Sequence, residues 1–192
     1  QLDRDIDILI IGKDDVAAPV TLPSGRLREP LDSCIVADAI VAADPEVEIE
    51  AAGHDIPVFQ VRRTLAPLVG SEDGIQLAGA DAGALAAVAG IAEPARFFAD
   101  LRRAGYTLAE ALAFRDHHPY TQRDVVRIFA RAAAAGAVAV VTTEKDFVRL
   151  LPFRPFRMPV LWAPLTMEPD PLPGFRRWLA GSMDAARDTI AG

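Results

Sequence analysis

Cysteine is almost absent from this chain of 192 residues: Cys34 stands alone, so no disulfide can form within the chain. We interpret Cys34 as a small buried apolar side chain, the common role of an isolated thiol. No run of roughly 18 to 20 apolar residues is present, so no segment has the length and hydropathy of a membrane-spanning helix. No secretory signal pattern is visible either.

An excess of positive charge is also lacking. Lysine and arginine number 20 against 27 aspartate and glutamate residues, giving a formal net charge of −7. Nucleic-acid-binding domains usually carry a basic face, so no nucleic-acid partner is expected. Local basic clusters do occur, at Arg62-Arg63, at Arg102-Arg103 and from Arg149 to Arg157. Such clusters are usually solvated surface, and contact with anionic lipid or phosphate is the alternative.

Glycine-rich nucleotide motifs are the third absence. Neither GxxxxGK[ST] nor a GxGxxG segment after a strand occurs, so the chain alone has no obvious means of holding a nucleotide triphosphate. The sequence opens at Gln1 without an initiator methionine and enters a strand pattern within a few residues. We therefore expect a further segment upstream.

What the sequence does contain is a repeated alternation of strand and helix patterns in a chain that is 51% hydrophobic. This alternation predicts an α/β fold, with a parallel sheet between two layers of helices. The segment Leu108–Phe114 fits either a strand or a helix, and the alanines of Ala84–Ile91, where a strand is expected, also leave a helix possible. Apolar runs predict strands at Ile6–Ile11, Asp38–Ala43, Ala84–Ile91, Ala137–Val141 and Met158–Trp162, and the first of these is expected to be buried on both faces of the sheet. Helices are predicted at Leu31–Val36, Pro94–Ala104, Thr121–Gly136 and Phe175–Ile190.

Three parts are expected along the chain. Residues 1–44 resemble the end of an α/β domain, and residues 65–192 form a second α/β domain. Residues 45–64 are expected to link them, because Glu46–Glu50 and Pro57–Arg63 alternate apolar with polar side chains. A hairpin through the loop around His54 would make this linker two-stranded.

The densest polar cluster runs from Asp116 through His117 and His118 to Thr121. If Leu108–Phe114 is a parallel strand, the cluster follows its carboxyl end, where ligands and catalytic groups collect in open α/β sheets. A histidine beside a carboxylate suits general-base chemistry. Alternatively, these side chains only cap the helix that starts at Thr121, and both interpretations remain open. No metal site is predicted, because no third ligand stands at a recognisable spacing.

Two further clusters are weaker. The threonines and Lys145 of Thr142–Asp146 could bind an anion, but a capped helix start is the favoured interpretation. Arg26 and Arg28 could clamp a phosphate, with Glu29 orienting Arg28. From the residues alone, an exposed charged loop is the favoured interpretation of this segment.

Four segments, taken in order, resemble one family. Their sequences are similar to the family patterns P-A-G-P-L-R-E-P-L, G-I-A-x-P-x-R-F-F, F-x-D-H-H-x-[FY]-T and T-T-E-K-D, and they lie at Pro23–Leu31, Gly90–Phe98, Phe114–Thr121 and Thr142–Asp146. Each match is weak alone, but four in order are specific. The chain resembles the C-terminal portion of the tetraacyldisaccharide 4'-kinases of lipid A synthesis.

This resemblance implies a P-loop-kinase-like fold of two α/β domains joined by a two-stranded linker. It implies transfer of phosphate from ATP, with Mg²⁺, to the 4' hydroxyl of tetraacyldisaccharide 1-phosphate. The setting would be the cytoplasmic face of the inner membrane of a Gram-negative bacterium, with peripheral attachment to that membrane. ATP and Mg²⁺ would be bound by an N-terminal part that this chain lacks, so the chain alone is expected to be inactive.

The resemblance also implies roles for single residues. His117, supported by Asp116, would pair with an aspartate of the family's D-D-G-F-Q motif to deprotonate the sugar hydroxyl. Arg28, held by Glu29, would belong to the phosphate and substrate region between the domains. Positioning and charge neutralisation of this kind carry most of the catalysis in phosphoryl transfer.

The chain departs from the family pattern in places, and two other functions stay open. The D-D-G-F-Q motif and the Walker A lysine are absent, and Arg26 stands where proline is usual. One alternative is a Mn²⁺-dependent phosphoesterase with an Asp-His-His motif, for which Asp14-Asp15 and Asp38 would be further ligands. The other is a non-enzymatic α/β module that binds a partner or a lipid.

Overall fold

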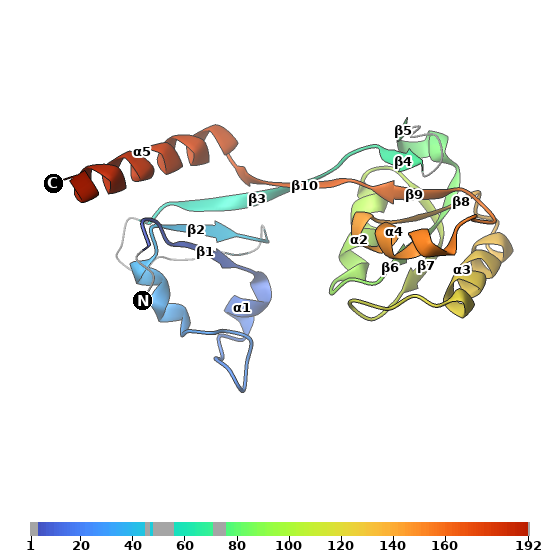
Figure 1. Ribbon diagram of the computed structural model, residues 1–192, viewed down its shortest axis with the longest axis horizontal. Coiled ribbons are helices and arrows are strands. Elements are labelled where there is room, and N and C mark those ends of the chain that lie inside the picture. Colours follow the sequence, from blue (N-terminus) through green and yellow to red (C-terminus); the bar gives the residue numbers. More distant parts are fainter. Residues whose placement is uncertain (1–3, 45–46, 48–55, 71–75, 192) are drawn as a thin grey trace. The chain divides into compact units, whose positions relative to one another are not determined.

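The computed structural model describes residues 4–44, 47, 56–70 and 76–191. They form two compact units, the first from Gln1–Arg63 with Met167–Gly192 and the second from Thr64–Thr166. The chain passes from one unit to the other twice, through strand β3 (Val58–Leu65) and strand β10 (Leu165–Asp170) (Figure 1).

The first unit is built on a four-stranded sheet with the order β1-β2-β3-β10. Strands β1 (Ile8–Ile11), β2 (Ala39–Ala42) and β3 run parallel, confirming the three predicted strands in this part of the chain. The other elements of the unit are helix α1 (Lys13–Ala17), the 3₁₀ helix η1 (Leu31–Val36) and helix α5 (Leu172–Ala191).

Strand β1 is less buried than its apolar sequence predicted. Ile11 is 2% exposed and packs with Ile40 and Val16, whereas Ile10 is 69% exposed. Successive side chains of a strand point to opposite faces of the sheet, and this core covers only one of them. The prediction of burial on both faces is therefore wrong for this strand.

The neighbours of β3 are β2 and β10, so the second strand beside β3 comes from far along the chain. Arg62 of β3 joins Asp170 of β10, with Nη2 2.7 Å from Oδ1. The predicted strand Glu46–Glu50 and the loop around His54 lie outside the described residues, except for Val47. Strand β10 was not among the predicted strands; it contains Pro169, which is tolerated at the edge of a sheet.

Residues after Met167 belong to the first unit rather than to a single C-terminal domain over residues 65–192. The physical reason is an aromatic cluster. The ring of Phe59 in β3 lies 5.1 Å from Phe175 and 5.8 Å from Trp178, both in α5. Aromatic side chains bury much apolar area, so this cluster holds α5 against the sheet of the first unit.

The second unit contains a six-stranded sheet with the order β5-β4-β9-β8-β6-β7. Strands β7, β6, β8 and β9 run parallel, and the short strands β4 and β5 are antiparallel additions at one edge. The ambiguous segment Leu108–Phe114 is therefore a strand. The strands are β4 (Leu68–Gly70), β5 (Gln76–Leu77), β6 (Ala84–Ala89), β7 (Thr107–Ala113), β8 (Ala139–Thr143) and β9 (Val160–Ala163). The helices are η2 (Gly79–Ala82), α2 (Pro94–Arg103), α3 (Gln122–Ala134), α4 (Glu144–Leu150) and η3 (Leu151–Phe153).

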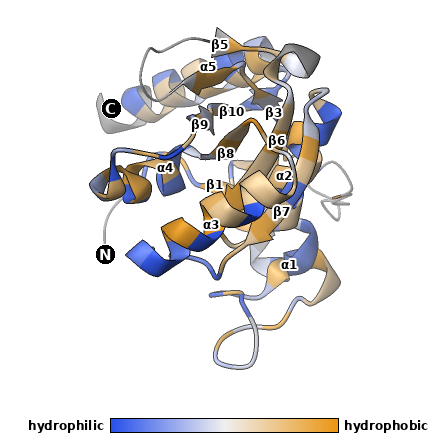
Figure 2. Ribbon diagram, turned by 90° about the vertical axis from the view of Figure 1, so that its right-hand side faces the viewer, coloured by the Kyte–Doolittle hydropathy of each residue, from blue (hydrophilic) through white to orange (hydrophobic). Residues whose placement is uncertain are grey.

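Helices cover both faces of this sheet, which confirms the three-layer prediction. From β6, Leu85 and Ala87 pack with Leu101 of α2. The alternate residue Val88 packs on the other face with Ile128 of α3. Figure 2 shows α3 with both hydrophobic and hydrophilic stretches, as expected for a helix with one buried side. No helix in the described part of the chain has the length and hydropathy needed to cross a membrane.

Replacing Ile128 by alanine should lower the free energy of unfolding by about 2–5 kcal/mol, because Ile128 is only 2% exposed and its loss leaves a cavity. The matched control is Val126→Ala in the same helix, where the side chain is 46% exposed. That change should stay within about 0.5 kcal/mol of the wild type. Urea unfolding of the two variants measures both effects, and equal losses would contradict the assigned inner face of α3.

Candidate functional site

Polar groups gather where three neighbouring parallel strands of the second unit end. Gly90 follows β6, the segment Asp116–His118 follows β7, and α4 follows β8 directly. Since β7, β6 and β8 lie side by side in parallel, their carboxyl ends meet at one edge of the sheet. This is the edge where ligands bind in open α/β sheets.

His117 has an unusual backbone conformation at this edge. Its φ of +56° lies in the left-handed region, which L-amino acids other than glycine rarely adopt. Its amide donates to the carbonyl of Gly90 at 3.1 Å and to Oδ1 of Asp116 at 2.9 Å, so both neighbours hold the conformation. Strained residues that the surroundings fix in this way cluster at functional sites. The side chain itself is 67% exposed.

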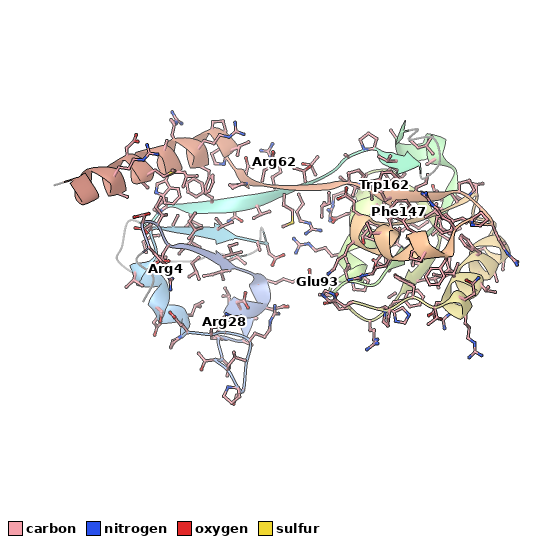
Figure 3. The ribbon with its side chains drawn as sticks, in the orientation of Figure 1. Arg4, Arg28, Arg62, Glu93, Phe147 and Trp162 are labelled. Carbon is pink, nitrogen blue, oxygen red and sulfur yellow. The ribbon has the colours of Figure 1, made fainter. Side chains whose placement is uncertain are left out.

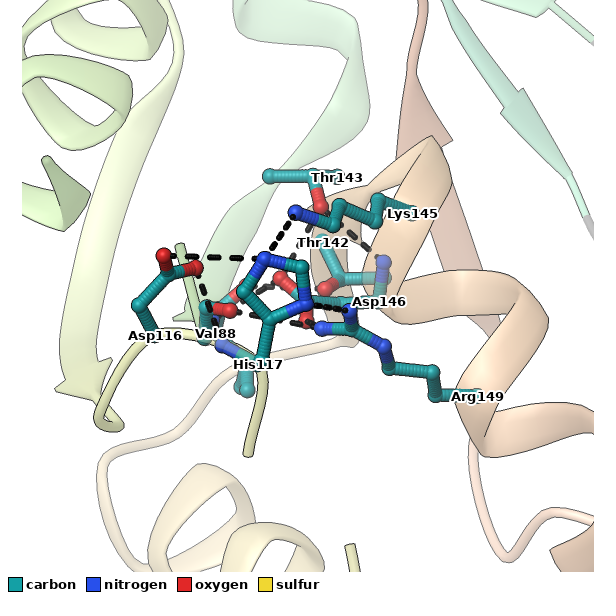
Figure 4. A network of polar contacts seen from close by, with 9 residues as sticks. Val88, Asp116, His117, Thr142, Thr143, Lys145, Asp146 and Arg149 are labelled. Carbon is teal, nitrogen blue, oxygen red and sulfur yellow. Dashed lines mark hydrogen bonds and ion pairs between the residues drawn. The ribbon is translucent and has the colours of Figure 1, made fainter. Parts of the chain in front are cut away.

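Three charged groups surround the His117 ring (Figure 4). Nη2 of Arg149 lies 3.0 Å from Nδ1, and Nζ of Lys145 lies 3.2 Å from Nε2. Oδ2 of Asp116 lies 3.7 Å from Nε2. An arginine guanidinium and a lysine ammonium can only donate, so each contact requires its ring nitrogen to accept, and a neutral imidazole can satisfy only one of them at a time. In the tautomer that accepts from Arg149 at Nδ1, the ring proton is on Nε2, the nitrogen that faces the carboxylate of Asp116.

The position of Arg149 depends on a fully buried carboxylate, that of Asp146. Its Oδ2 accepts from the amide of Gly90 at 2.8 Å and from the hydroxyl of Thr143 at 2.9 Å. Its Oδ1 lies 3.2 Å from Nη1 of Arg149, which also donates to the carbonyl of Gly90 at 3.4 Å. Asp146 therefore links the end of β6 to α4 and directs Arg149 toward His117.

The loop after β6 needs a glycine at position 90. A Cβ there would lie 3.0 Å from the Tyr120 hydroxyl and 3.1 Å from Oδ1 of Asp146, both tighter than usual contacts. Burial, reinforced by the negative charge of Asp146, raises the pKa of Tyr120 well above its ordinary value. Tyr120 therefore stays a neutral phenol and adds no charge to the site.

The predicted capped helix start at Thr142–Asp146 is confirmed. The hydroxyl of Thr143 accepts from the amide of Asp146, and the buried hydroxyl of Thr142 donates to the carbonyl of Val88 at 2.8 Å. Both threonines are thus used inside the fold. Glu144 and Lys145 are the exposed members of this motif, and Lys145 contacts the His117 ring.

The two adjacent histidines have different roles. Nε2 of His118 lies 3.1 Å from Oδ2 of Asp124, and its ring lies 4.7 Å from that of Phe114. Asp124 forms a capping box with Thr121 at the start of α3. The capping interpretation therefore holds for His118, whereas the ring of His117 contacts Lys145 and Arg149.

Sequence reasoning missed the parts played by Asp146 and Arg149. The available signal was their spacing of three residues after a buried strand, which places two side chains on one face of a helix. That spacing does not reveal that Gly90, far away in the sequence, supplies the second partner of the carboxylate.

Arg28 and Glu29 lie in the first unit, on the loop that precedes η1 (Figure 3). Both are exposed and line a cavity of about 470 Å³, together with Arg4, Asp7 and Ser33. The loop is narrow at its base, where Leu22 donates to the carbonyl of Leu27 at 2.7 Å. Gly25 is required within this loop, because a Cβ at position 25 would overlap the carbonyl of Val20.

The expected contact between Glu29 and Arg28 is not among those formed by the described residues. Glu29 instead lies near Arg4, whose pKa is raised mainly by a hydrogen bond with Asp7 and slightly by the charge of Glu29. Arg26, at the position where the family usually has proline, pairs with Asp14 at 2.8 Å. Arg28 forms no such pair within the described chain and leaves its guanidinium available at the cavity.

The described residues contain no group of three or more histidine, cysteine, aspartate or glutamate side chains that could hold a metal ion. The aspartates considered for a manganese site each have another partner. Asp15 accepts from the amide of Gly12 at 2.9 Å, Asp14 pairs with Arg26, and Asp38 accepts from the amide of Asp7 at 2.7 Å.

Mostly parallel sheets flanked by helices, with polar groups at the carboxyl ends of the strands, are the architecture of open α/β folds, of which P-loop-kinase folds are one group. A solved structure of this class is similar to the chain: LpxK from Aquifex aeolicus, in an "apo" form in complex with ATP. The TM-score is 0.64 at 24% sequence identity, over 94% of this chain and 53% of that protein.

The particular family follows from the sequence match. A model of the family described as "Tetraacyldisaccharide-1-P 4'-kinase" matches residues 1–184, so the chain belongs to this family. A tetraacyldisaccharide 4'-kinase of Koribacter versatilis is 42% identical over 151 residues, covering 78% of this chain and 44% of the relative. A tetraacyldisaccharide 4'-kinase of Rhodopseudomonas palustris is 35% identical over 196 residues, covering 97% of this chain and 55% of the relative. The chain thus spans about half the length of the curated relatives it matches.

The stability of the second unit should depend on the ionisation of Asp124. Hydrogen bonds from Thr121 and, next, from His118 lower the pKa of Asp124 to about 2, below its ordinary value near 4. A lowered pKa in the folded state means that the stabilisation is complete above about pH 4 and is lost as the pH falls through about 2. Chemical unfolding between pH 5 and 2 should show a shallower loss of stability in Asp124→Asn than in the wild type. Identical slopes would contradict this assignment.

Proposed function

We propose that the chain is part of an ATP-dependent kinase that phosphorylates the 4' hydroxyl of tetraacyldisaccharide 1-phosphate, a step of lipid A biosynthesis. The main support is the family match over residues 1–184. The charged cluster around the strained His117 supplies groups of the kind that phosphoryl transfer requires.

In this proposal His117 takes part in removing the proton from the sugar hydroxyl. Support comes from its place at the carboxyl edge of the sheet and from its exposed ring. Asp116 supports the ring as the carboxylate that lies 3.7 Å from Nε2, and Arg149 contacts Nδ1 from the other side. An aspartate that lies outside this chain completes the pair with His117, as the family resemblance implies.

Arg28 is proposed to hold a phosphate of the substrate at the cavity of the first unit. A guanidinium can bind a phosphate through two parallel hydrogen bonds, and that of Arg28 is exposed beside the cavity. Glu29 is proposed to line the same site and to limit its positive charge, rather than to hold Arg28 directly.

ATP phosphates and Mg²⁺ are proposed to bind to a part of the protein outside this chain. The chain contains no glycine-rich phosphate loop, and its described residues hold no cluster of three metal-ligating side chains. Magnesium would neutralise charge on the transferred phosphoryl group when bound. By itself the chain is therefore proposed to be inactive. Its proposed setting is peripheral, on the cytoplasmic face of the inner membrane of a Gram-negative bacterium.

Changing His117 to alanine in the complete gene product should lower kcat by a factor of about 10²–10⁴, the usual contribution of a general acid–base group. The measurement is transfer of radiolabelled phosphate from ATP to the lipid acceptor. His118→Asn is the matched control, because His118 contacts the capping box of α3. It should lower the melting temperature but keep most of the turnover. Near-normal turnover in His117→Ala would remove this residue from the mechanism.

Changing Arg28 to alanine should raise KM for the phosphorylated acceptor by roughly 10- to 100-fold, because a charge-assisted contact is worth about 1.5–3 kcal/mol. Arg26→Ala is the control in the same loop, since Arg26 is engaged with Asp14. It should change KM little. Acceptor titrations at saturating ATP separate the two variants, and equal effects would point to general loss of positive charge instead.

A further inference from the structure

The charged cluster around His117 contains more donors than its acceptors can use. A neutral imidazole has one N–H donor and one acceptor nitrogen. Yet a cationic side chain faces each nitrogen, Arg149 at Nδ1 and Lys145 at Nε2. When Arg149 donates to Nδ1, Nε2 carries the proton and has no lone pair for the ammonium of Lys145.

The less exposed polar groups of the same motif, Thr142, Thr143 and Asp146, are already engaged. The hydroxyls of Thr142 and Thr143 bond to Val88 and Asp146. Asp146 is fully buried, and its two oxygens bond to Gly90, Thr143 and Arg149. Within the described part of the chain, Lys145 has no carboxylate at ion-pair distance, and its polar contact is the ring of His117.

Arg149 differs from Lys145 in this respect. It is anchored by Asp146 and by the Gly90 carbonyl, and its side chain is only 25% exposed. Lys145 is exposed and stands on a flexible stem, so it can move to another acceptor at little cost. The missing component of the cluster is therefore an acceptor that carries negative charge and reaches Lys145 from solvent.

We propose that Lys145 binds a phosphoryl group, whose oxygens supply the acceptors that the cluster lacks. On binding, the ammonium moves from Nε2 of His117 to a phosphoryl oxygen. Nε2 is then free of the ammonium and faces Asp116 and the same phosphoryl group. Lys145 thus binds the anion and also releases the His117 ring, while Arg149 keeps the ring in place.

This inference deepens the proposed function by assigning Lys145 to the same site, and it rests on that proposal for the identity of the phosphoryl group. The shared chemistry is a phosphate dianion or phosphate monoester. It could belong to the nucleotide, to the phosphorylated sugar, or to free phosphate.

The chain offers a clean way to test the assignment, because Lys13 and Lys145 are its only lysines. Lysine labelled with ¹⁵N in the intact 192-residue chain gives one side-chain signal from each. Titration with inorganic phosphate should move the Lys145 signal and the His117 ring signals, and leave the Lys13 signal in place. Lys145→Met should weaken phosphate binding roughly 10- to 100-fold, while Lys145→Arg should restore part of it.

Lys13→Met is the matched control, since it removes the same charge from an exposed position in the first unit. Equal weakening by both lysine variants, or undiminished binding in Lys145→Met, would overturn the proposal. Parallel titrations with metal-free ATP and with glucosamine 1-phosphate identify the source, because the true ligand should bind more tightly than inorganic phosphate and show the same dependence on Lys145.

The outcome can be separated from that of the proposed kinase function. Phosphate binding by the chain requires neither ATP turnover nor the remainder of the protein. If His117→Ala left kinase turnover intact but Lys145→Met lost phosphate binding, the role of His117 in catalysis would fall and the anion site would stand. The reverse pair of results would leave the kinase proposal standing without Lys145.

Discussion

The arrangement at the edge of the second sheet depends on one buried carboxylate. Asp146 is completely enclosed, and an ionised group in that position is tolerated only when hydrogen bonds replace water. Thr143 and Arg149 provide these bonds from around the same helix start, and Gly90 provides another from 56 residues before Asp146. Because the buried charge would be costly without all three partners, the loop after β6, the start of α4 and the guanidinium of Arg149 are fixed together.

That constraint explains why His117 can adopt its left-handed backbone. The carbonyl of Gly90 accepts from the His117 amide, and the same residue donates its own amide to Asp146. Gly90 therefore joins the buried carboxylate of Asp146 to the backbone of His117 through its amide and its carbonyl. The His117 side chain, although 67% exposed, is thus held through its own backbone and through the contact of Arg149 with Nδ1. Lys145 is the cation of this group that has no carboxylate at ion-pair distance among the described residues.

Much of the second unit could be predicted from the sequence, because its signals are local. The Thr121–Asp124 capping box, the proline at the start of α2 and the apolar run of β6 each specify an element over a few residues. The site was predicted only in part. Asp116 and His117 were recognised by their motif, but the link from Asp146 to Gly90 joins distant segments and has no local pattern. Strand β10 was missed for a similar reason, since its partner β3 lies about a hundred residues earlier.

The path of the chain has an architectural consequence. Since residues 64–166 leave the first unit from β3 and return to it through β10, the second unit is an insertion into the first. The two ends of the insertion leave and enter on adjacent strands, and the amide of Ala66 bonds to the carbonyl of Pro164 at 2.9 Å. Close termini are the condition under which one domain can be accommodated within another without disrupting its host. The charged cluster around His117 therefore lies wholly on the inserted unit, while β3 and β10 remain neighbours in the sheet of the host unit.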